Sequence, residues 1–247
     1  MRKYYILGES TLDVILQSDM SANATPGGIF LKTACRLSRA GYSVSFISEL
    51  GLDPIGRLIA GELTDAGVDI SDCDHFDCGQ SPVRVMLGNR LQRYDCWPQH
   101  EGFDIAWPRI EAEDVVLFGG YYSLDPRIRK PLLSFLSYAS ESGATMVYVP
   151  SVADMRINRI TKVMPQVFEN LEMTSLLVSL PKDLPILYDT SDSARAYRDQ
   201  VSYYCRSMVA IEGTPDEAHA VSFGDAPKLP GRSMTVIDTL INILISL

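Results

Sequence analysis

The sequence predicts an α/β fold built on a mostly parallel central sheet. Short apolar runs alternate along the 247 residues with stretches in which apolar residues recur at helical spacing, a pattern typical of a layered α/β domain. Most of the runs are apolar at every position, so helices are expected to cover both faces of the strands. An α/β chain of this length commonly forms one unit around one core. We therefore expect a single domain over residues 1–247.

Strands are expected where four or so apolar residues follow one another. These runs cover residues 4–7, 44–47, 115–118, 146–149, 176–178 and 208–211. Helices are expected over residues 55–63, after Pro54, and over residues 132–139, opened by Asp125-Pro126 and ended by Gly143. The amphipathic segment 191–205 predicts a further helix.

Two stretches do not fit this alternation. Residues 9–22 and 82–107 read as extended chain that carries polar and aromatic side chains, including Arg84 and Arg93. Such stretches can pair with each other, so we expect them to form a small sheet beside the main one.

Composition and charge narrow the class of partner. Asp and Glu number 31 against 22 Lys and Arg, a net charge of -9, which disfavours nucleic acid and anionic membranes. Five scattered cysteines do not form a disulfide framework. Glu9 and Asp13 interrupt the first apolar run before a signal-peptide core is complete, and residues 236–247 are too short for a membrane span. The sequence thus predicts a cytoplasmic protein that binds small molecules or proteins.

The most informative segment is residues 24–70. It contains Gly27-Gly28 before an expected helix, the run Gly51-Leu52-Asp53-Pro54-Ile55-Gly56, and Gly67-Val68-Asp69. Paired glycines before a helix allow the backbone to approach a ligand closely and aim free N–H groups at its oxygens. A simple turn is the other interpretation of the glycine pair, since glycine most often serves the backbone alone.

The order of these pieces resembles the N-terminal half of the ribokinase or PfkB carbohydrate kinase family. Gly8-Glu9 with Asp13 is similar to that family's first strand and sugar-binding Asp, and Gly27-Gly28 is similar to the glycine pair that closes over the sugar. Residues 37–67 resemble the family's N-terminal signature, and residues 114–120 a later strand that ends in glycines near the substrate. The match is specific over about the first third of the chain.

This resemblance implies a three-layer ribokinase-like fold with a small β lid. The lid would be formed by residues 9–22 and 82–107 and would allow a homodimer to form. The resemblance also implies ATP-dependent phosphoryl transfer to a sugar or related alcohol, with ATP and Mg²⁺ as cofactors. Asp13, Gly27, Gly28 and Lys32 are then the candidate substrate-binding residues.

Two of these candidates can be weighed on their chemistry. The carboxylate of Asp13 could accept hydrogen bonds from two hydroxyl groups at once, although an Asp at a strand end or turn is an equally good interpretation. Lys32 stands where a sugar-kinase relative usually has Asn, and its ammonium cannot accept a hydrogen bond. It could hold an anionic substrate group, or it could be an exposed helix lysine.

The second half of the chain departs from the family's pattern. Relatives carry a Gly-Ala-Gly-Asp turn whose amides form an anion hole and whose Asp is the base. Here Val236-Ile237-Asp238-Thr239 is followed by Leu240-Ile241-Asn242-Ile243-Leu244, so Asp238 and Thr239 read as a helix N-cap and no catalytic residue is assigned. The nucleotide-side loops of the family correspond at best to residues 180–183 and 210–213, which makes Asp183 and Gly213 the nucleotide-binding candidates.

The sequence therefore predicts a carbohydrate kinase of this family that is impaired in catalysis. The alternative is a non-catalytic sugar-binding or dimerising sensor, a pseudokinase. The resemblance also implies C-terminal helices that complete the nucleotide pocket, and we expect this chain to lack them.

Other site types find less support. Cys73, His75, Cys78, Cys96 and His100 lie close in sequence and could supply zinc ligands, but their spacing is not that of a known finger, and we expect no metal bound by these residues. Nothing singles out one thiol as a hydrolase nucleophile. A Gly-x-Gly-x-x-Gly sequence after a strand, which would indicate an NAD-binding enzyme, is also lacking.

Overall fold

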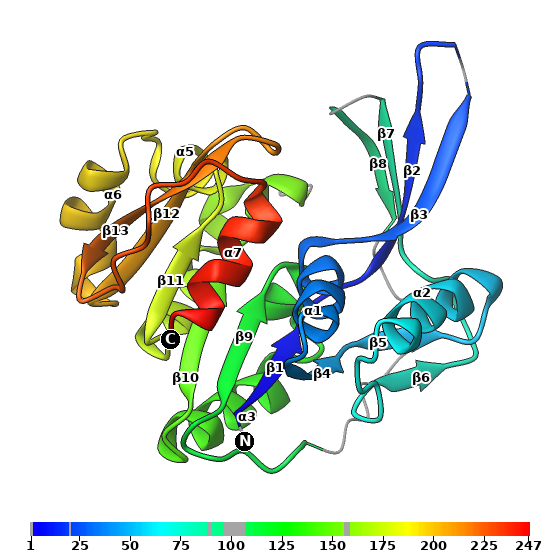
Figure 1. Ribbon diagram of the computed structural model, residues 1–247, viewed down its shortest axis with the longest axis horizontal. Coiled ribbons are helices and arrows are strands. Elements are labelled where there is room, and N and C mark those ends of the chain that lie inside the picture. Colours follow the sequence, from blue (N-terminus) through cyan, green and yellow to red (C-terminus); the bar gives the residue numbers. More distant parts are fainter. Residues whose placement is uncertain (1, 20, 88–89, 96–106, 156–158) are drawn as a thin grey trace. The chain divides into compact units, whose positions relative to one another are not determined.

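The computed structural model describes residues 2–19, 21–87, 90–95, 107–155 and 159–247 (Figure 1). The chain forms two compact units, one of residues 1–4 with 109–247 and one of residues 5–108. We call them unit 1 and unit 2. None of the helices in the described part of the chain has the length and apolar composition that a membrane crossing requires.

Unit 1 is built on strands that follow one another in the order β13-β12-β11-β10-β9. Strands β9 to β12 are parallel neighbours, with Val147 of β10 opposite both Leu117 and Leu176. β13 is antiparallel to β12. The strands span β9 Val115–Gly119, β10 Thr145–Val149, β11 Leu176–Ser179, β12 Ser207–Gly213 and β13 Ala218–Gly224.

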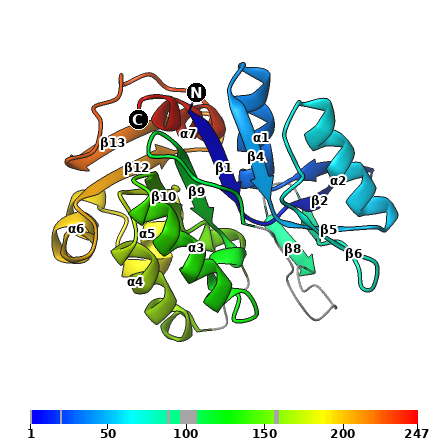
Figure 2. The same ribbon diagram turned by 90° about the horizontal axis from the view of Figure 1, so that it is seen from below.

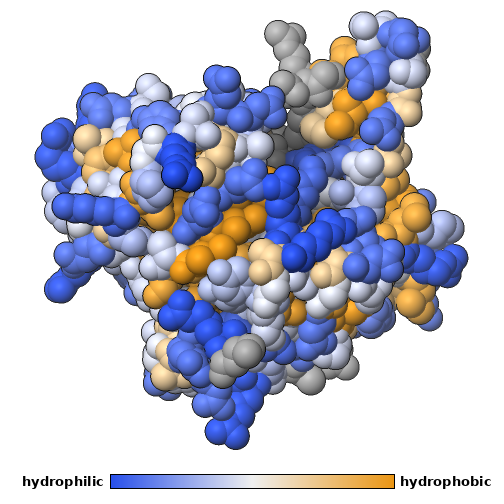
Figure 3. Space-filling model, viewed as in Figure 1, coloured by the Kyte–Doolittle hydropathy of each residue, from blue (hydrophilic) through white to orange (hydrophobic). Residues whose placement is uncertain are grey.

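Helices cover both faces of this sheet, as the uniformly apolar strands require. Figure 2 shows α3 and α4 on one face and α7 on the other. The helices are α3 Arg129–Glu141, α4 Met164–Glu172, α5 Asp183–Tyr188, α6 Ser193–Asp199 and α7 Val236–Ile245, with single 3-10 turns η1 Tyr121–Leu124, η2 Val152–Asp154, η3 Ile160–Lys162 and η4 Val201–Tyr203. Leu240 and Leu244 of α7 are fully buried, and apolar side chains also gather on the outer surface over α7 (Figure 3).

Within the part that the structure describes, unit 2 contains two helices and three sets of strands. β1 Lys3–Leu7, which begins in unit 1, has β4 Ser43–Ile47 as its neighbour, and β5 Glu49–Gly51 pairs in parallel with β6 Asp74–Phe76. A separate four-stranded sheet has the order β3-β2-β7-β8, formed by β2 Thr11–Leu16, β3 Ala22–Gly27, β7 Val83–Leu87 and β8 Arg90–Asp95. The helices are α1 Ile29–Arg39 and α2 Pro54–Asp65.

The α/β class and the parallel strands predicted from the sequence are confirmed. Each expected strand lies within a strand of the structure, extended by one or two residues at an end. The two extended stretches, 9–22 and 82–107, do pair with each other through β2 and β7. The second strand of the first stretch runs on to Gly27, and residues 96–106 of the second lie outside the described residues.

Two helix boundaries were predicted wrongly. Asp125-Pro126 does not open α3, because the Asp125 carboxylate accepts a hydrogen bond from the N–H of Arg127 and holds a turn there. The helix begins at Arg129. The segment 191–205 is not one helix, since α6 ends at Asp199 and Gln200, at φ -133°, separates it from η4.

Candidate functional site

The predicted substrate-binding residues of unit 2 gather around Asp13. This residue lies in β2, where Thr25 of β3 is its register partner on one side and Arg84 of β7 on the other. β3 ends at Gly27, and Gly28 is the N-cap residue of α1, which carries Lys32 one turn further on. The passage from β3 into α1 thus brings residues 13, 27, 28 and 32 together.

The Asp13 carboxylate is enclosed by hydrogen-bond donors. Its Oδ1 accepts from Arg84 Nε at 2.9 Å and from Thr11 Oγ1 at 2.7 Å. Its Oδ2 accepts from Arg84 Nη2 at 2.7 Å, and Lys32 Nζ lies 3.5 Å from the same oxygen. Asp13 is only 1% exposed. Burial alone would raise the pKa of Asp13, but the hydrogen bonds and charge of Arg84, with help from Thr11 and Lys32, lower it below its usual value.

Gly27 is required by the position of this carboxylate. A Cβ at Gly27 would overlap the carboxylate of Asp13, so a larger residue there would displace it. Gly28 adopts φ 98° as it turns the chain into α1, and a side chain would be strained at that angle. The simple-turn interpretation of the glycine pair is therefore incomplete, because Gly27 makes room for a charged side chain.

Lys32 lies at the border of this cluster. The apolar residues of α1, including Phe30, Leu31, Ala34 and Leu37, are buried, which leaves Lys32 on the helix's exposed side. Its side chain is 46% exposed while its ammonium remains within ion-pair distance of Asp13. The ammonium can therefore contact both the buried carboxylate and a ligand.

Arg84 and Thr11 are site residues that the sequence reasoning did not identify. In the sequence Arg84 is one of several arginines in an extended stretch, and it lies 71 residues from Asp13. The available signal was an Arg and an Asp on two strands expected to pair. Their register could not be read from the sequence, and a slip of one residue would turn Arg84 to the opposite face of the sheet.

The Gly-x-Asp-x-x-Gly part of the N-terminal signature holds β7 in place. Asp53 caps α2 by accepting from the N–H of Gly56 at 2.7 Å, and it also accepts from the N–H and hydroxyl of Ser81 at 2.7 and 2.9 Å. Ser81 lies two residues before the start of β7, and the carbonyl of Pro82, which stands between them, accepts from the N–H of Leu12 in β2. Asp53 therefore helps to set the register that places Arg84 beside Asp13.

Asp183, a predicted nucleotide-binding residue of unit 1, is completely buried. Its carboxylate accepts hydrogen bonds from the N–H groups of Val152 at 2.9 Å, Leu180 at 3.0 Å and Ser151 at 3.2 Å. It thereby joins the loops that follow β10 and β11. Burial raises the pKa of Asp183 to about 6, against the opposing effect of these backbone hydrogen bonds.

Gly213, the second nucleotide-binding candidate, ends β12 and opens the turn to β13. It has φ 114°, and a Cβ there would collide with the Glu217 carbonyl. The turn closes through the N–H of Thr214, which donates to the same carbonyl at 2.9 Å. No hydrogen bond in the described part of the chain joins Gly213 to Asp183, so their role in nucleotide binding stays a prediction.

The first turn of α7 is capped by the chain's own side chains. Thr235 Oγ1 accepts from the N–H of Asp238 at 3.1 Å and donates to Asp238 Oδ2 at 2.6 Å. The N-cap residue is Thr235, so the expectation that Asp238 and Thr239 form the N-cap is wrong, and both lie within the helix. The hydroxyl of Thr239 donates to the Thr235 carbonyl. Leu240, Ile241 and Ile243 follow and are buried.

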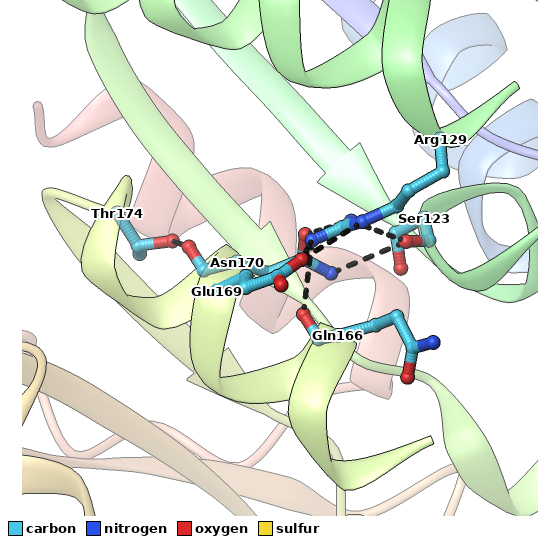
Figure 4. A network of polar contacts seen from close by, with 6 residues as sticks. All are labelled: Ser123, Arg129, Gln166, Glu169, Asn170 and Thr174. Carbon is cyan, nitrogen blue, oxygen red and sulfur yellow. Dashed lines mark hydrogen bonds and ion pairs between the residues drawn. The ribbon is translucent and has the colours of Figure 1, made fainter. Parts of the chain in front are cut away.

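A polar network at Arg129 organises the helices beside β9. The Arg129 guanidinium donates to Asn170 Oδ1 at 2.6 Å, to the Ser123 carbonyl at 2.9 Å and to Glu169 Oε2 at 2.6 Å. Figure 4 shows it between η1 and α4, with Asn170 in turn donating to the Ser123 carbonyl. The network fixes the segment that follows the glycines Gly119 and Gly120.

The predicted cysteine and histidine cluster is only partly described. Cys96 and His100 lie outside the described residues. Cys73 is buried and its thiol donates to the Phe46 carbonyl at 3.1 Å, and burial raises its pKa to about 12, which disfavours the thiolate that binds a metal. Within the residues that the structure covers, no three His, Cys, Asp or Glu side chains gather as a metal ion would need.

Comparison with known proteins agrees with this architecture. A fructokinase from Escherichia coli is 26% identical over an alignment of 160 residues that covers 53% of this chain and 52% of that protein, so the chain spans about half the length of this curated relative. Among solved structures, a fructokinase from Vibrio cholerae O395, in its fructose, ADP and calcium ion bound form, is similar with a TM-score of 0.78 at 15% identity and covers 96% of this chain and 78% of its own.

A second solved structure is that of aminoimidazole riboside kinase from Salmonella enterica, complexed with aminoimidazole riboside and an ATP analogue. It is similar with a TM-score of 0.75 at 20% identity and covers 93% of this chain and 78% of its own. These neighbours show the ribokinase-like fold. Residues 2–178, well over half of the sequence, match the family described as pfkB family carbohydrate kinase. The chain therefore belongs to the PfkB family of carbohydrate kinases.

Proposed function

We propose that this member of the family binds a sugar or related polyol at the Asp13 site of unit 2 and is impaired in phosphoryl transfer. Sugar binding is supported by the hydrogen-bonded and ion-paired cluster of Asp13, Arg84, Thr11 and Lys32. Fructose is the first sugar to test, because both the curated relative and one structural neighbour are fructokinases.

The observation that carries the impairment is the first turn of α7. A helix N-terminus favours an anion when its N–H groups are free and no negative charge is near. Here Thr235 already accepts from the N–H of Asp238, and the Asp238 carboxylate lies in the same turn. Leu240 and Ile241, which are buried, follow in this helix. Unlike glycine, they do not leave the backbone open to close approach by a phosphate.

The other residues assigned to the nucleotide also do not fit Mg-ATP. The carboxylate of Asp183 is buried and takes its hydrogen bonds from three backbone N–H groups. The turn that Gly213 opens carries Asp216 and Glu217, which are exposed. Two carboxylates near a triphosphate raise its electrostatic energy. These residues therefore do not support a catalytic step through ATP.

A coupled ADP-release assay tests the proposal. The purified chain is incubated with Mg-ATP and a panel of sugars and nucleosides that includes fructose, with an active fructokinase as positive control. We expect ADP release no faster than without sugar. Sugar-dependent turnover on the order of 1 s⁻¹, within the usual range of kinases, would show that the chain is a working enzyme.

A second candidate function is a non-catalytic sugar sensor that acts as a dimer. β3 is an edge strand of the four-stranded sheet, and residues 22–25 of it are exposed, which supports pairing with a second copy. Light scattering should give twice the monomer mass at micromolar concentration. A monomer at all concentrations, with and without fructose, argues against this function.

We propose further that the protein acts in the cytoplasm. Cys35, Cys73, Cys78 and Cys205 are free thiols, which supports a reducing compartment. Fractionation of cells that express the full-length protein should place it in the cytosol, and recovery from a secreted fraction would contradict the assignment.

A further inference from the structure

We infer that the Asp13 site selects a sugar or polyol that carries a carboxylate, and that Lys32 is the residue that selects it. The inference rests on the proposed function, since it assumes that this site binds a sugar. It adds the substrate class and a specificity-determining residue.

The first step concerns the Asp13 carboxylate, which has little acceptor capacity left for a ligand. A carboxylate has about four lone-pair positions, and three hydrogen bonds already occupy three of them, two from Arg84 and one from Thr11. The ammonium of Lys32 lies 3.5 Å from Oδ2. With an exposed fraction of 1%, Asp13 could accept at most one hydrogen bond from a sugar hydroxyl, and only if Lys32 turned away. In this conformation a ligand meets Lys32 rather than Asp13.

The second step concerns the donor that the ligand does meet. Arg84 binds Asp13 through two hydrogen bonds, which is the strong bidentate geometry, and is itself almost buried. Lys32 is 46% exposed and its contact with Asp13, at 3.5 Å, is longer than a hydrogen bond of normal length. Because Arg84 already compensates the charge of Asp13, the charge of Lys32 is available to a ligand.

The third step concerns the charge that a ligand needs in order to complement Lys32. An ammonium has three donors and no acceptor, so it interacts most strongly with an anionic oxygen. The first turn of α1 contains no acidic residue, and the positive end of the helix dipole adds to the attraction. One exposed ammonium balances the single charge of a carboxylate, whereas a phosphate carries about -1.5 to -2. A sugar acid therefore fits the site better than a sugar phosphate.

A matched pair of ligands tests the inference. Gluconate and sorbitol share the same hydroxylated chain from C2 to C6 and differ only at C1, which is a carboxylate in one and an alcohol in the other. Calorimetric titration of the wild-type protein should show gluconate binding at least about tenfold more tightly than sorbitol, with an affinity that falls as salt is added. Glucose 6-phosphate serves as the phosphate arm.

Three variants identify the residue. Lys32→Met keeps most of the length of the side chain and removes its charge, and it should lower gluconate affinity about tenfold or more while leaving sorbitol affinity unchanged. Lys32→Asn should bind the two ligands equally. Arg36→Met is the control, because it removes the same charge from the exposed side of the same helix one turn away, and it should leave gluconate affinity within about twofold.

The outcomes separate this inference from the proposed function. If fructose or sorbitol binds as tightly as gluconate and Lys32→Met changes nothing, Lys32 is only an exposed helix residue and the inference is overturned, while sugar binding stands. If glucose 6-phosphate binds through Lys32 and gluconate does not, the carboxylate assignment is wrong. If no sugar, acid or phosphate binds, the sugar-binding half of the proposed function fails together with the inference.

Discussion

Replacing Arg84 by Met should destabilise unit 2 through the charge that it leaves behind on Asp13. The two hydrogen bonds from Arg84 are lost while Asp13 stays 1% exposed. Removing one partner of a buried ion pair costs about 3–5 kcal/mol. At about 2–4 °C per kcal/mol for a chain of this size, the melting temperature should fall by about 6–20 °C.

The effect should depend on pH in a defined direction. In the wild type the pKa of Asp13 is lowered, so its stabilising contribution is present above the unfolded value of 3.8 and disappears as the pH falls through the lowered pKa. In Arg84→Met the burial of Asp13 is no longer outweighed, and the folded-state pKa rises. The destabilisation should then be large at pH 7.5 and smaller at pH 4.5, where the buried carboxyl is protonated to a greater extent.

Urea unfolding followed by circular dichroism measures the free energy of unfolding at both pH values. The double variant Asp13→Asn/Arg84→Met is the control, because it removes both charges, and it should recover at least half of the stability lost in Arg84→Met. A loss that is equal at the two pH values and is not reduced by Asp13→Asn would refute the reasoning, since packing rather than charge would then explain it.

Three further changes have defined outcomes in thermal or urea unfolding. Gly27→Ala should lower the free energy of unfolding by about 1–3 kcal/mol, because its Cβ would overlap the Asp13 carboxylate. Gly61→Ala in α2, where a Cβ would meet no atom within 4 Å, should leave that free energy unchanged or raise it by up to about 1 kcal/mol. Equal effects of the two substitutions would contradict the prediction for Gly27. Thr235→Ala should cost about 1 kcal/mol by removing the cap of α7, and an unchanged melting temperature would show that the cap contributes nothing. Asp183 has a raised pKa of about 6, so the wild type should lose stability relative to Asp183→Asn as the pH rises from about 4 to 6; a parallel pH dependence of the two proteins would contradict it.

The fold could be predicted because its signals are local. Runs such as Val115-Val116-Leu117-Phe118 are apolar at every position, as in a strand that is covered on both faces and buries all four side chains. The start of α3 was missed for an equally local reason. An Asp-Pro pair commonly opens a helix, but the side chain of Asp125 bonds to the N–H of Arg127 and holds a separate turn first.

The site was predictable only in part, because its decisive contact is not local. Asp13, Gly27, Gly28 and Lys32 lie within 20 residues of one another and could be selected together from the sequence. Arg84 joins them through the parallel register of β2 and β7, which depends on side-chain packing across the sheet and on the Asp53–Ser81 hydrogen bonds. No pattern within a single segment of the sequence predicts the pairing of β2 with β7.

We propose that the carbohydrate kinase fold persists in this chain although the first turn of α7, Asp183 and Gly213 do not hold ATP. Isothermal titration calorimetry with Mg-ATP, at a protein concentration high enough to detect millimolar binding, tests it most directly. We predict a dissociation constant weaker than about 1 mM, a binding free energy smaller than about 4 kcal/mol in magnitude. Saturable binding with a dissociation constant in the micromolar range, about -8 kcal/mol, would contradict the account.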